Sequence, residues 1–311
     1  MLIATITLNP SIDRTLEIQH LVVGGMNRVI RKTDHPSGKG INVTRTLSDW
    51  GQPSEALALV GGASGDWLVE GLRQQGIKVD YVKVQGDTRI NLKIWDASKK
   101  RSTEVNEPGP KVTTEELEEL KSRVARNASG WDWLVISGSV PPGTPPDFYA
   151  NLVDIARSQG AKVALDASGA ALREGVKAIP DLIKPNEVEA AELLGWEPQD
   201  ETEAIEAVEE LAQSGIRYVL LTLGKAGAFV GYGGQIWQGI PPEIEARSTV
   251  GCGDSAVAGM VWALKEGKDL SEAMCWAMAA GAAAATTWGT EPADWETVVR
   301  LVDQVKVYRH R

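Results

Sequence analysis

The sequence predicts an α/β protein in which helices cover both faces of a mainly parallel sheet. Short apolar runs rich in Val, Ile and Leu alternate with longer stretches of helical periodicity, and such runs are typical of strands buried in a parallel sheet. This alternation indicates right-handed βαβ units and therefore a three-layer αβα architecture. The 311 residues are enough to bury a full core without disulfides or structural metal.

The elements of this body follow in order along the chain. The expected strands span residues 1–8, 55–60, 133–137, 162–166, 182–184 and 218–222. The expected helices span residues 40–50, 66–75, 114–128, 146–159, 187–194 and 202–214. Capping-type residues at 113–116 open one helix, and Gly160 and Gly215 follow the ends of two others. An apolar helical run covers 256–264, and the Ala-rich stretch 277–287 is too weakly hydrophobic to cross a bilayer, so we expect a buried helix there.

Two segments, residues 14–37 and 87–105, do not follow this alternation of buried strands and helices. Polar Thr15 and Glu17 alternate with apolar Leu16 and Ile18 in the first, and the second alternates in the same way. Period-two patterns predict a small sheet with one exposed face. We interpret it as a lid on a single domain that spans residues 1–311. Exposed strand edges invite pairing with a second lid, so a homodimer through the lid is expected.

Charge and cysteine content exclude several function classes. The formal net charge is −10, and the acidic excess lies in residues 151–311, which disfavours nucleic acid as a partner. Residues 14–45 and 73–101 are locally basic and are candidate anion-facing segments, although a run of Lys is usually just a solvated face. The start of the chain has no basic targeting region, and no membrane partner is expected. Cys252 and Cys275 have no metal-type spacing, which favours a reducing cytoplasm.

A first glycine-rich motif leads directly into an expected helix. Gly38, Lys39 and Gly40 precede Asn42 there. A helix N-terminus carries free N–H groups and partial positive charge, so it suits an anion, and Lys39 adds a point charge. The motif lacks the Walker A spacing, and a plain glycine-rich turn is the alternative interpretation.

A second motif combines small residues with a carboxylate. Gly251, Cys252 and Gly253 stand before Asp254 at the start of an apolar helix. Open N–H groups beside a carboxylate suit phosphoryl transfer, because the amides hold developing negative charge and the carboxylate takes a proton from the attacking hydroxyl. The alternative is that Asp254 only caps its helix.

Two further segments follow expected strands. Asn186 and Glu189 are three residues apart and share one helix face, so together they are candidates to position a hydrated Mg²⁺. A capping arrangement that opens the helix is the alternative. The turn at residues 222–227 can pass close to a nucleotide, or it is an ordinary turn. A glycine-rich stretch at 61–65 resembles a dinucleotide loop only weakly, because its spacing differs.

Together these segments resemble the ribokinase-like (PfkB) carbohydrate kinase family, in particular its 1-phosphofructokinase and tagatose-6-phosphate kinase branch. The matching blocks follow one another along nearly the whole chain, at residues 7–13, 37–43, 88–91, 106–110, 137–143, 166–172 and 249–255. The resemblance implies a ribokinase-like fold and phosphorylation of a ketohexose monophosphate to a bisphosphate, with ATP and Mg²⁺ as cofactors. Fructose 1-phosphate ranks first, ahead of tagatose 6-phosphate and fructose 6-phosphate.

The resemblance also implies residue roles. Sugar hydroxyls would be held by Asp13, Gly38 and Asn42. The substrate phosphate would be bound by Arg28, Lys39, Arg89 and Ser139. ATP would be contacted by Lys184, Asn186, Thr222, Gly224, Gly227 and Ser248. Mg²⁺ would be organised by Asn186 and Glu189. The anion hole would be Gly251, Cys252 and Gly253, with Asp254 as the base.

One departure and two competing classes remain. Cys252 stands where the family usually has Ala or another small residue, which places an oxidisable thiol beside the base. A non-catalytic sensor of sugar phosphates is one alternative, and the intact Asp254 with its glycines argues against it. A dehydrogenase is the other, and nicotinamide-cofactor binding would support it.

Overall fold

A ten-stranded sheet forms the centre of the protein. The structure is a computed structural model, and it describes residues 2–311. The strands lie in the order β14-β13-β12-β11-β10-β9-β8-β1-β4-β5. Their bounds are β1 (Leu2–Thr7), β4 (Ser54–Val60), β5 (Lys78–Lys83), β8 (Trp131–Ser137), β9 (Lys162–Asp166), β10 (Leu182–Ile183), β11 (Tyr218–Thr222), β12 (Ala228–Tyr232), β13 (Gln235–Ile240) and β14 (Lys306–Arg309). Neighbours from β5 to β11 pair in parallel, and β12 to β14 add an antiparallel edge.

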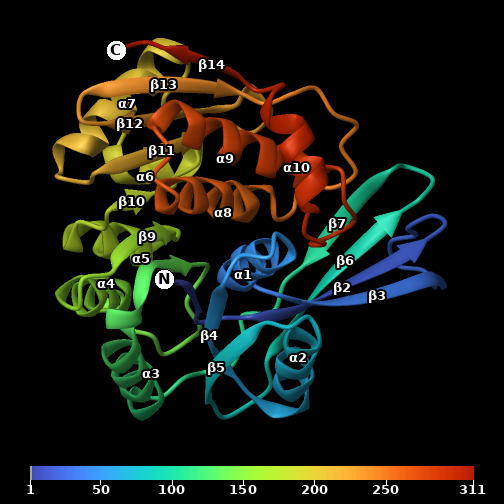
Figure 1. The fold of residues 1–311 in the computed structure, drawn as a ribbon. Helices are drawn as coiled ribbons and strands as arrows, with labels where there is room; N and C mark the ends of the chain where they lie inside the picture. Colours follow the sequence, from blue (N-terminus) through green and yellow to red (C-terminus); the bar gives the residue numbers. More distant parts are fainter. Residues whose placement is uncertain (1) are drawn as a thin grey trace.

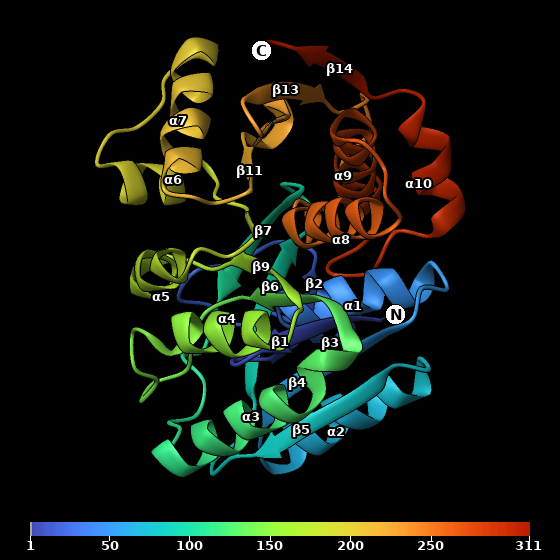
Figure 2. The ribbon, with the colours of Figure 1, turned by 60° about the vertical axis from the view of Figure 1, so that its left-hand side comes forward.

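Helices cover both faces of this sheet, as Figures 1 and 2 show. One face packs against α3 (Thr114–Asn127), α4 (Phe148–Ser158), α5 (Gly169–Gly175), α6 (Glu187–Leu194) and α7 (Glu201–Gln213). The other packs against α1 (Lys39–Asp49), α2 (Gly62–Gln74), α8 (Cys252–Lys265), α9 (Leu270–Ala285) and α10 (Trp295–Val302). Side chains of β4 alternate between the two cores, since Leu57 and Leu59 enter one and Ala56, Ala58 and Val60 the other. The predicted three-layer α/β fold is confirmed.

The sequence located most elements of the body closely. Strands β9 and β11 and helix α6 have the expected bounds, while α2 begins four residues before the expected position. The capping box of α3 is present: Thr113 Oγ1 accepts from Glu116 N, and Glu116 accepts from Thr113 N. The sequence prediction missed β5, β12, β13 and β14, and the helices α5 and α10. Met1, the first residue of an expected strand, lies outside the described residues.

A second, smaller sheet projects from one end of the body (Figure 1). We call it the lid sheet, and its order is β3-β2-β6-β7. It comprises β2 (Ser11–Ile18), β3 (Val29–Ser37), β6 (Arg89–Asp96) and β7 (Arg101–Val105). β2 pairs in parallel with β6, and the other two pairs are antiparallel. Both expected segments therefore form strands of one small sheet, and β2 starts slightly before its segment.

The Ala-rich stretch near the end of the chain forms most of α9, whose residues are largely buried against the sheet and α8. Within residues 2–311, no helix combines the length and apolar character needed to cross a membrane.

Candidate active site

The N-terminus of helix α1 packs against the end of strand β1, and two glycines make this close contact possible. Gly38 precedes the helix with φ 126°. A Cβ on Gly38 would lie 2.7 Å from Thr7 Cγ2, and one on Gly40 would lie 2.5 Å from Thr7 Oγ1. Only glycine lets the helix N-terminus approach β1 this closely. The glycine-rich segment is therefore explained by packing, whatever ligand it also meets.

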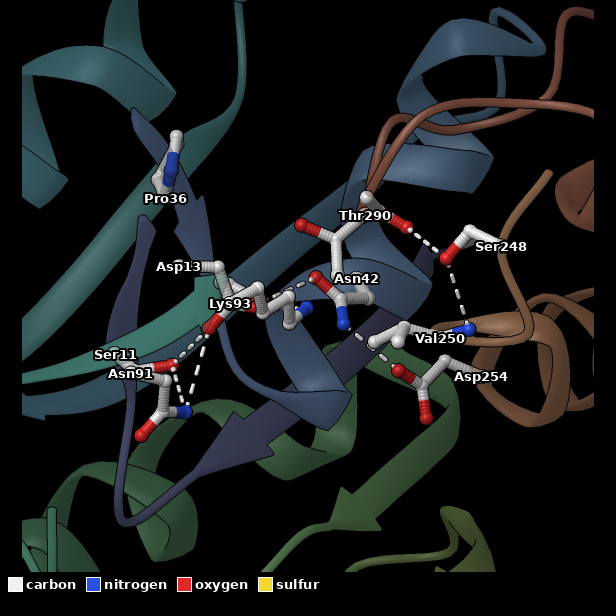
Figure 3. Close-up of polar contacts among 12 residues, drawn as sticks. Ser11, Asp13, Pro36, Asn42, Asn91, Lys93, Ser248, Val250, Asp254 and Thr290 are labelled. Carbon is white, nitrogen blue, oxygen red and sulfur yellow. Dashed lines mark hydrogen bonds and ion pairs between the residues drawn. The ribbon is translucent and has the colours of Figure 1, made fainter. Parts of the chain in front are cut away.

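Asp254 lies in the first turn of α8 and points toward α1 (Figure 3). Its Oδ2 accepts a hydrogen bond from Asn42 Nδ2 at 2.8 Å. Ser37 Oγ in turn donates to Asn42 Oδ1 at 3.1 Å, which fixes the orientation of the amide. Gly251 precedes α8 with φ 82°, and no side chain caps this helix. Asp254 is thus held across the interface between two helices and does not act as a cap.

The environment of Asp254 suits a proton acceptor. Burial raises the pKa of Asp254 to about 6, and the charge of Asp166 adds to the shift, while Lys39, the Asn42 hydrogen bond and Lys184 oppose it. A carboxyl with a pKa near the working pH is an efficient general base.

Asp166 lies at the carboxyl end of β9 between two lysines. Its Oδ1 is 3.2 Å from Lys39 Nζ and 3.1 Å from Lys184 Nζ. Ser137 Oγ donates to Oδ2 at 3.1 Å. Burial acts to raise the pKa of Asp166, but the charges of Lys184 and Lys39 outweigh it, so its pKa is lowered. The charge of Asp166 raises the pKa of Lys39.

This ion cluster lies beside the start of α8. A Cβ on Gly253 would be 3.6 Å from Lys184 Nζ, and one on Gly138 would be 3.6 Å from Lys39 Cβ. Two ammonium groups and the first amides of α8 therefore border the same region. The sequence analysis did not single out Asp166 as a site residue. Its position at the end of a predicted parallel strand was the available signal, because polar residues there meet at the active edge of α/β sheets.

Asn186 and Glu189 form a capping box at the start of α6. Asn186 Oδ1 accepts from Glu189 N at 2.8 Å, and Glu189 Oε2 accepts from Asn186 N at 2.9 Å. The alternative interpretation, a capping arrangement, therefore describes their present contacts. One carboxylate and one amide oxygen also fit a Mg²⁺ ion that keeps most of its water. Among residues 2–311, no three His, Cys, Asp or Glu side chains are grouped so as to hold a metal ion.

The turn after β11 lies next to this helix start. Thr222 N donates to Pro185 O at 3.0 Å, and Thr222 forms an isolated bridge with Asn186. Gly224 and Gly227 both have positive φ. A Cβ on Gly227 would lie 2.1 Å from Gly239 O, so close packing against β13 accounts for this glycine without a ligand.

A polar cluster around Asp13 lines the inner side of the lid sheet (Figure 3). Asp13 Oδ2 is 2.6 Å from Lys93 Nζ, and both side chains are buried. Asp13 Oδ1 accepts from Ser11 Oγ at 2.9 Å and from Asn91 Nδ2 at 3.3 Å. Asn91 Oδ1 is buried and has no hydrogen-bond partner among residues 2–311. The sequence analysis missed Lys93, although Arg89, Asn91 and Lys93 share one face of a predicted strand.

Arg89 and Ser139 meet beside Asn9. Arg89 donates from Nε and Nη2 to Asn9 O at 3.2 and 3.0 Å, and from Nη1 to Glu107 O at 3.0 Å. Asn9 Nδ2 donates to Ser139 Oγ at 3.3 Å. These carbonyls orient the guanidinium without neutralising it. Arg28 does not join this cluster: it is exposed in the segment that connects β2 and β3, at the tip of the lid sheet.

Comparison with known proteins assigns this arrangement to a family. The model of the pfkB family carbohydrate kinases matches residues 6–297. The chain belongs to this family. A 1-phosphofructokinase of Bacillus subtilis is 33% identical over 308 residues, which cover 99% of this chain and 100% of the relative.

Solved structures of related enzymes agree with this kinase in fold. Phosphofructokinase-2 from Escherichia coli, solved in complex with potassium, has a TM-score of 0.93 at 31% identity and covers 97% of this chain and 98% of its own. A possible 1-phosphofructokinase from Thermotoga maritima has a TM-score of 0.91 at 31% identity, with 100% of both chains covered. The predicted resemblance to ribokinase-like kinases is confirmed.

Cys252 begins α8 in this kinase, and its thiol is partly buried. Burial raises the pKa of Cys252 to about 11, and the charge of Asp254 acts in the same direction. A thiol that remains protonated reacts slowly with oxidants. This environment disfavours the oxidation that we expected of a thiol beside the base, which would have inactivated the enzyme.

Proposed function

We propose that this kinase transfers the γ-phosphoryl group of ATP to a ketohexose monophosphate and forms a bisphosphate. Fructose 1-phosphate is the first candidate substrate. The observation that carries the proposal is Asp254, a buried carboxyl with a pKa of about 6 at the start of α8. Asp254 accepts a hydrogen bond from Asn42, a proposed sugar-binding residue, and the charges of Lys39 and Lys184 act on its pKa, so it has the surroundings that a base next to both substrates needs. The 1-phosphofructokinase relative supports the choice of substrate.

Asp254 acts as the base for the acceptor hydroxyl. Its hydrogen bond from Asn42 holds one oxygen, which leaves the other free to accept a proton. The amides of Gly251, Cys252 and Gly253 form the anion hole for the transferred phosphoryl, since helix N-termini bind phosphate. Loss of the proton to Asp254 makes the hydroxyl oxygen a nucleophile at the moment of transfer.

Lys39 and Lys184 supply positive charge at the phosphates. Their shared partner Asp166 keeps both ammonium groups at fixed positions, 3.2 and 3.1 Å from one oxygen. Lys39 also borders Gly138, next to Ser139, and so lies between the sugar phosphate and ATP. Asn186, Thr222, Gly224, Gly227 and Ser248 would contact ATP. Mg²⁺, held through water by Asn186 and Glu189, would offset the charge of the ATP phosphates.

The lid sheet binds the sugar phosphate. Asp13, Gly38 and Asn42 hold its hydroxyls, and Arg89 with Ser139 binds its existing phosphate. The oriented guanidinium of Arg89 suits bidentate phosphate recognition. We propose that the whole chain acts as a single domain with this lid, and that the enzyme works in a reducing cytoplasm, consistent with its two free cysteines.

A second copy of the chain is proposed to pair through the lid sheet. The segment between β2 and β3 exposes Val22, Val23 and Met26, and β3 exposes Val29 and Ile30. Apolar side chains that gather on one exposed tip favour an interface with another protein surface. In the dimer Arg28 would lie within this interface, where the partner copy could bring it to a substrate phosphate.

One coupled assay tests the reaction and the substrate together. ATP consumption is measured with fructose 1-phosphate, tagatose 6-phosphate and fructose 6-phosphate in parallel. We expect the highest kcat/KM with fructose 1-phosphate. A higher value for tagatose 6-phosphate or fructose 6-phosphate would move the assignment to that substrate. If none of the three supports ATP turnover, the proposed reaction is wrong and a sensor of sugar phosphates becomes the better interpretation.

A further inference from the structure

Arg45 is a buried arginine that bonds to main-chain carbonyl groups on two separate elements. It lies in α1 and is 5% exposed. Its Nη1 donates to Pro36 O at 3.1 Å and to Thr290 O at 2.8 Å. No carboxylate forms an ion pair with it within residues 2–311. A buried charge without a bonded counter-ion is costly unless hydrogen bonds hold it, and these two carbonyls supply its main-chain hydrogen bonds.

The two carbonyls belong to segments that are far apart in the sequence. Pro36 is the second-last residue of the lid-sheet strand β3, directly before Ser37, which is followed by Gly38 and α1. Thr290 lies in the segment between α9 and α10. Arg45 therefore joins the lid sheet to the segment between α9 and α10.

From Thr290 the contacts continue to the start of α8. Gly289 O accepts from Ser248 Oγ at 3.2 Å, and Ser248 Oγ accepts from Val250 N at 3.2 Å (Figure 3). Val250 directly precedes Gly251, the residue before α8. An unbroken series of hydrogen bonds and peptide links thus runs from the lid sheet to the proposed anion hole.

The same segment touches the lid sheet at two further points. Trp288 packs edge-on against Trp95 of β6, with ring centroids 5.5 Å apart. Glu291 Oε1 lies 3.5 Å from His35 Nε2 of β3. The cavity left between these surfaces has a volume of about 40 Å³. The lid sheet and the segment therefore touch at two points around a small cavity.

We propose that Arg45 is a positioning residue that couples the lid sheet to residues 248–253, so that sugar phosphate and ATP each strengthen the binding of the other. A ligand that fixes one end of this series also fixes the other, so the second ligand meets a site that is already ordered. Arg45 touches neither ligand, and its effect passes through Thr290 and Ser248. The inference rests on the proposed function, because it takes both ligands from it.

The test measures the coupling itself. The dissociation constant of AMP-PNP with Mg²⁺ is determined with and without saturating fructose 1-phosphate. We expect the wild type to bind the nucleotide at least about 5-fold more tightly when the sugar phosphate is present. In Arg45→Met both hydrogen bonds from Nη1 to the carbonyls are lost, and the ratio should fall to within about 2-fold of one, while the two separate affinities change little. In Arg45→Lys one nitrogen donor remains, so an intermediate ratio is expected.

Gln75→Ala is the matched control. Gln75 Oε1 accepts from Arg45 Nε at 3.2 Å, and the residue is exposed. Its removal leaves both carbonyl contacts intact, so the coupling should stay at the wild-type value. If Arg45→Met does not fold, Arg45→Lys must still show less coupling than the wild type.

The outcomes separate the inference from the proposed function. Equal coupling in the wild type and the folded Arg45 variants would overturn the role of Arg45, and so would a wild type without coupling. Failure of the wild type to turn over ATP with any ketohexose monophosphate would instead overturn the proposed reaction. A variant that lowers both separate affinities but keeps the ratio would show a purely structural role for Arg45.

Discussion

At the residue scale, the proposed reaction depends on the carboxyl of Asp254 as general base. The substitution Asp254→Asn tests this role. The amide retains the size and the contact with Asn42 but accepts no proton. We expect kcat to fall by roughly 10²–10⁴-fold, the usual contribution of a general base, with little change in nucleotide affinity. Steady-state kinetics and a nucleotide binding titration measure the two effects. Turnover near the wild-type value would remove Asp254 from the role of base.

The pH dependence of kcat follows from the same group. Asp254 accepts a proton only when it is ionised, so activity should rise with pH through its pKa of about 6. In Asp166→Asn a negative charge that raises this pKa is lost, and the positive charges of Lys39 and Lys184 are no longer offset. Both changes favour the ionised form of Asp254, so the midpoint of the pH profile should move to lower pH.

Ser137→Ala serves as the control for this shift. It removes one hydrogen bond to Asp166 but keeps the charge, so the midpoint should stay close to the wild-type value. A midpoint that remains in place in Asp166→Asn, or moves to higher pH, would contradict the assigned electrostatic role. The maximal kcat of Asp166→Asn should also fall, because both lysines lose the partner that orients them.

The sequence identified the site residues that stand in short motifs, and it missed those defined by distant contacts. Asp254 and Asn42 each follow glycines at a helix start, and the structure brings the two together. Lys93 shares a strand face with Arg89, but its ion pair with Asp13 joins residues 80 apart in the sequence. Asp166 stands at the end of a predicted strand, but its contact with Lys39 joins residues 127 apart in the sequence. Spacing along a chain carries no information about such pairs.

At the scale of elements, the close packing of α8 and α9 requires a glycine at position 259, and this requirement can be tested. A Cβ on Gly259 would lie 2.5 Å from the backbone oxygen of Trp276. Gly259→Ala must therefore push the helices apart, at a cost of about 1–3 kcal/mol, typical of overpacking. We expect a melting temperature several degrees below that of the wild type in thermal denaturation.

Gly71→Ala is the matched control for this substitution. Its new Cβ would meet only Pro36 Cγ, at an ordinary 3.6 Å, and alanine is favoured over glycine inside a helix. This variant should be as stable as the wild type or more stable. Equal melting temperatures for Gly259→Ala and the wild type would show that α8 and α9 can separate without cost.

The elements that the sequence revealed are those with the strongest patterns. Strands of the parallel sheet are buried on both faces, so they appear as continuous apolar runs. β14 reads Lys-Val-Tyr-Arg and is largely exposed, and β5 is only partly buried. Such edge strands gain their structure from hydrogen bonds to a neighbour, which local periodicity does not reveal.

At the scale of the whole molecule, the exposed lid tip leads to a prediction about assembly. Met26 is 80% exposed and Ile30 is 59% exposed. The double variant Met26→Glu, Ile30→Lys should weaken a lid-mediated dimer, because charges are costly to bury at an interface. Sedimentation velocity should then show a dimer for the wild type and a monomer for the variant. A wild type that sediments as a monomer, or a variant that remains a dimer, would contradict the proposed interface.

The order of elements along the chain has a consequence for biosynthesis. All four strands of the lid sheet are complete by Val105, whereas the segment that closes against them, residues 288–291, is made much later. At about 5–20 residues per second, on the order of 10–40 s pass between synthesis of the last lid-sheet strand and synthesis of the closing segment. The lid sheet is therefore uncovered on the ribosome during this time. During this interval, until residue 254 is made, the nascent chain holds Asp13 and Arg89 but not Asp254, so kinase activity must wait for the later part of the chain.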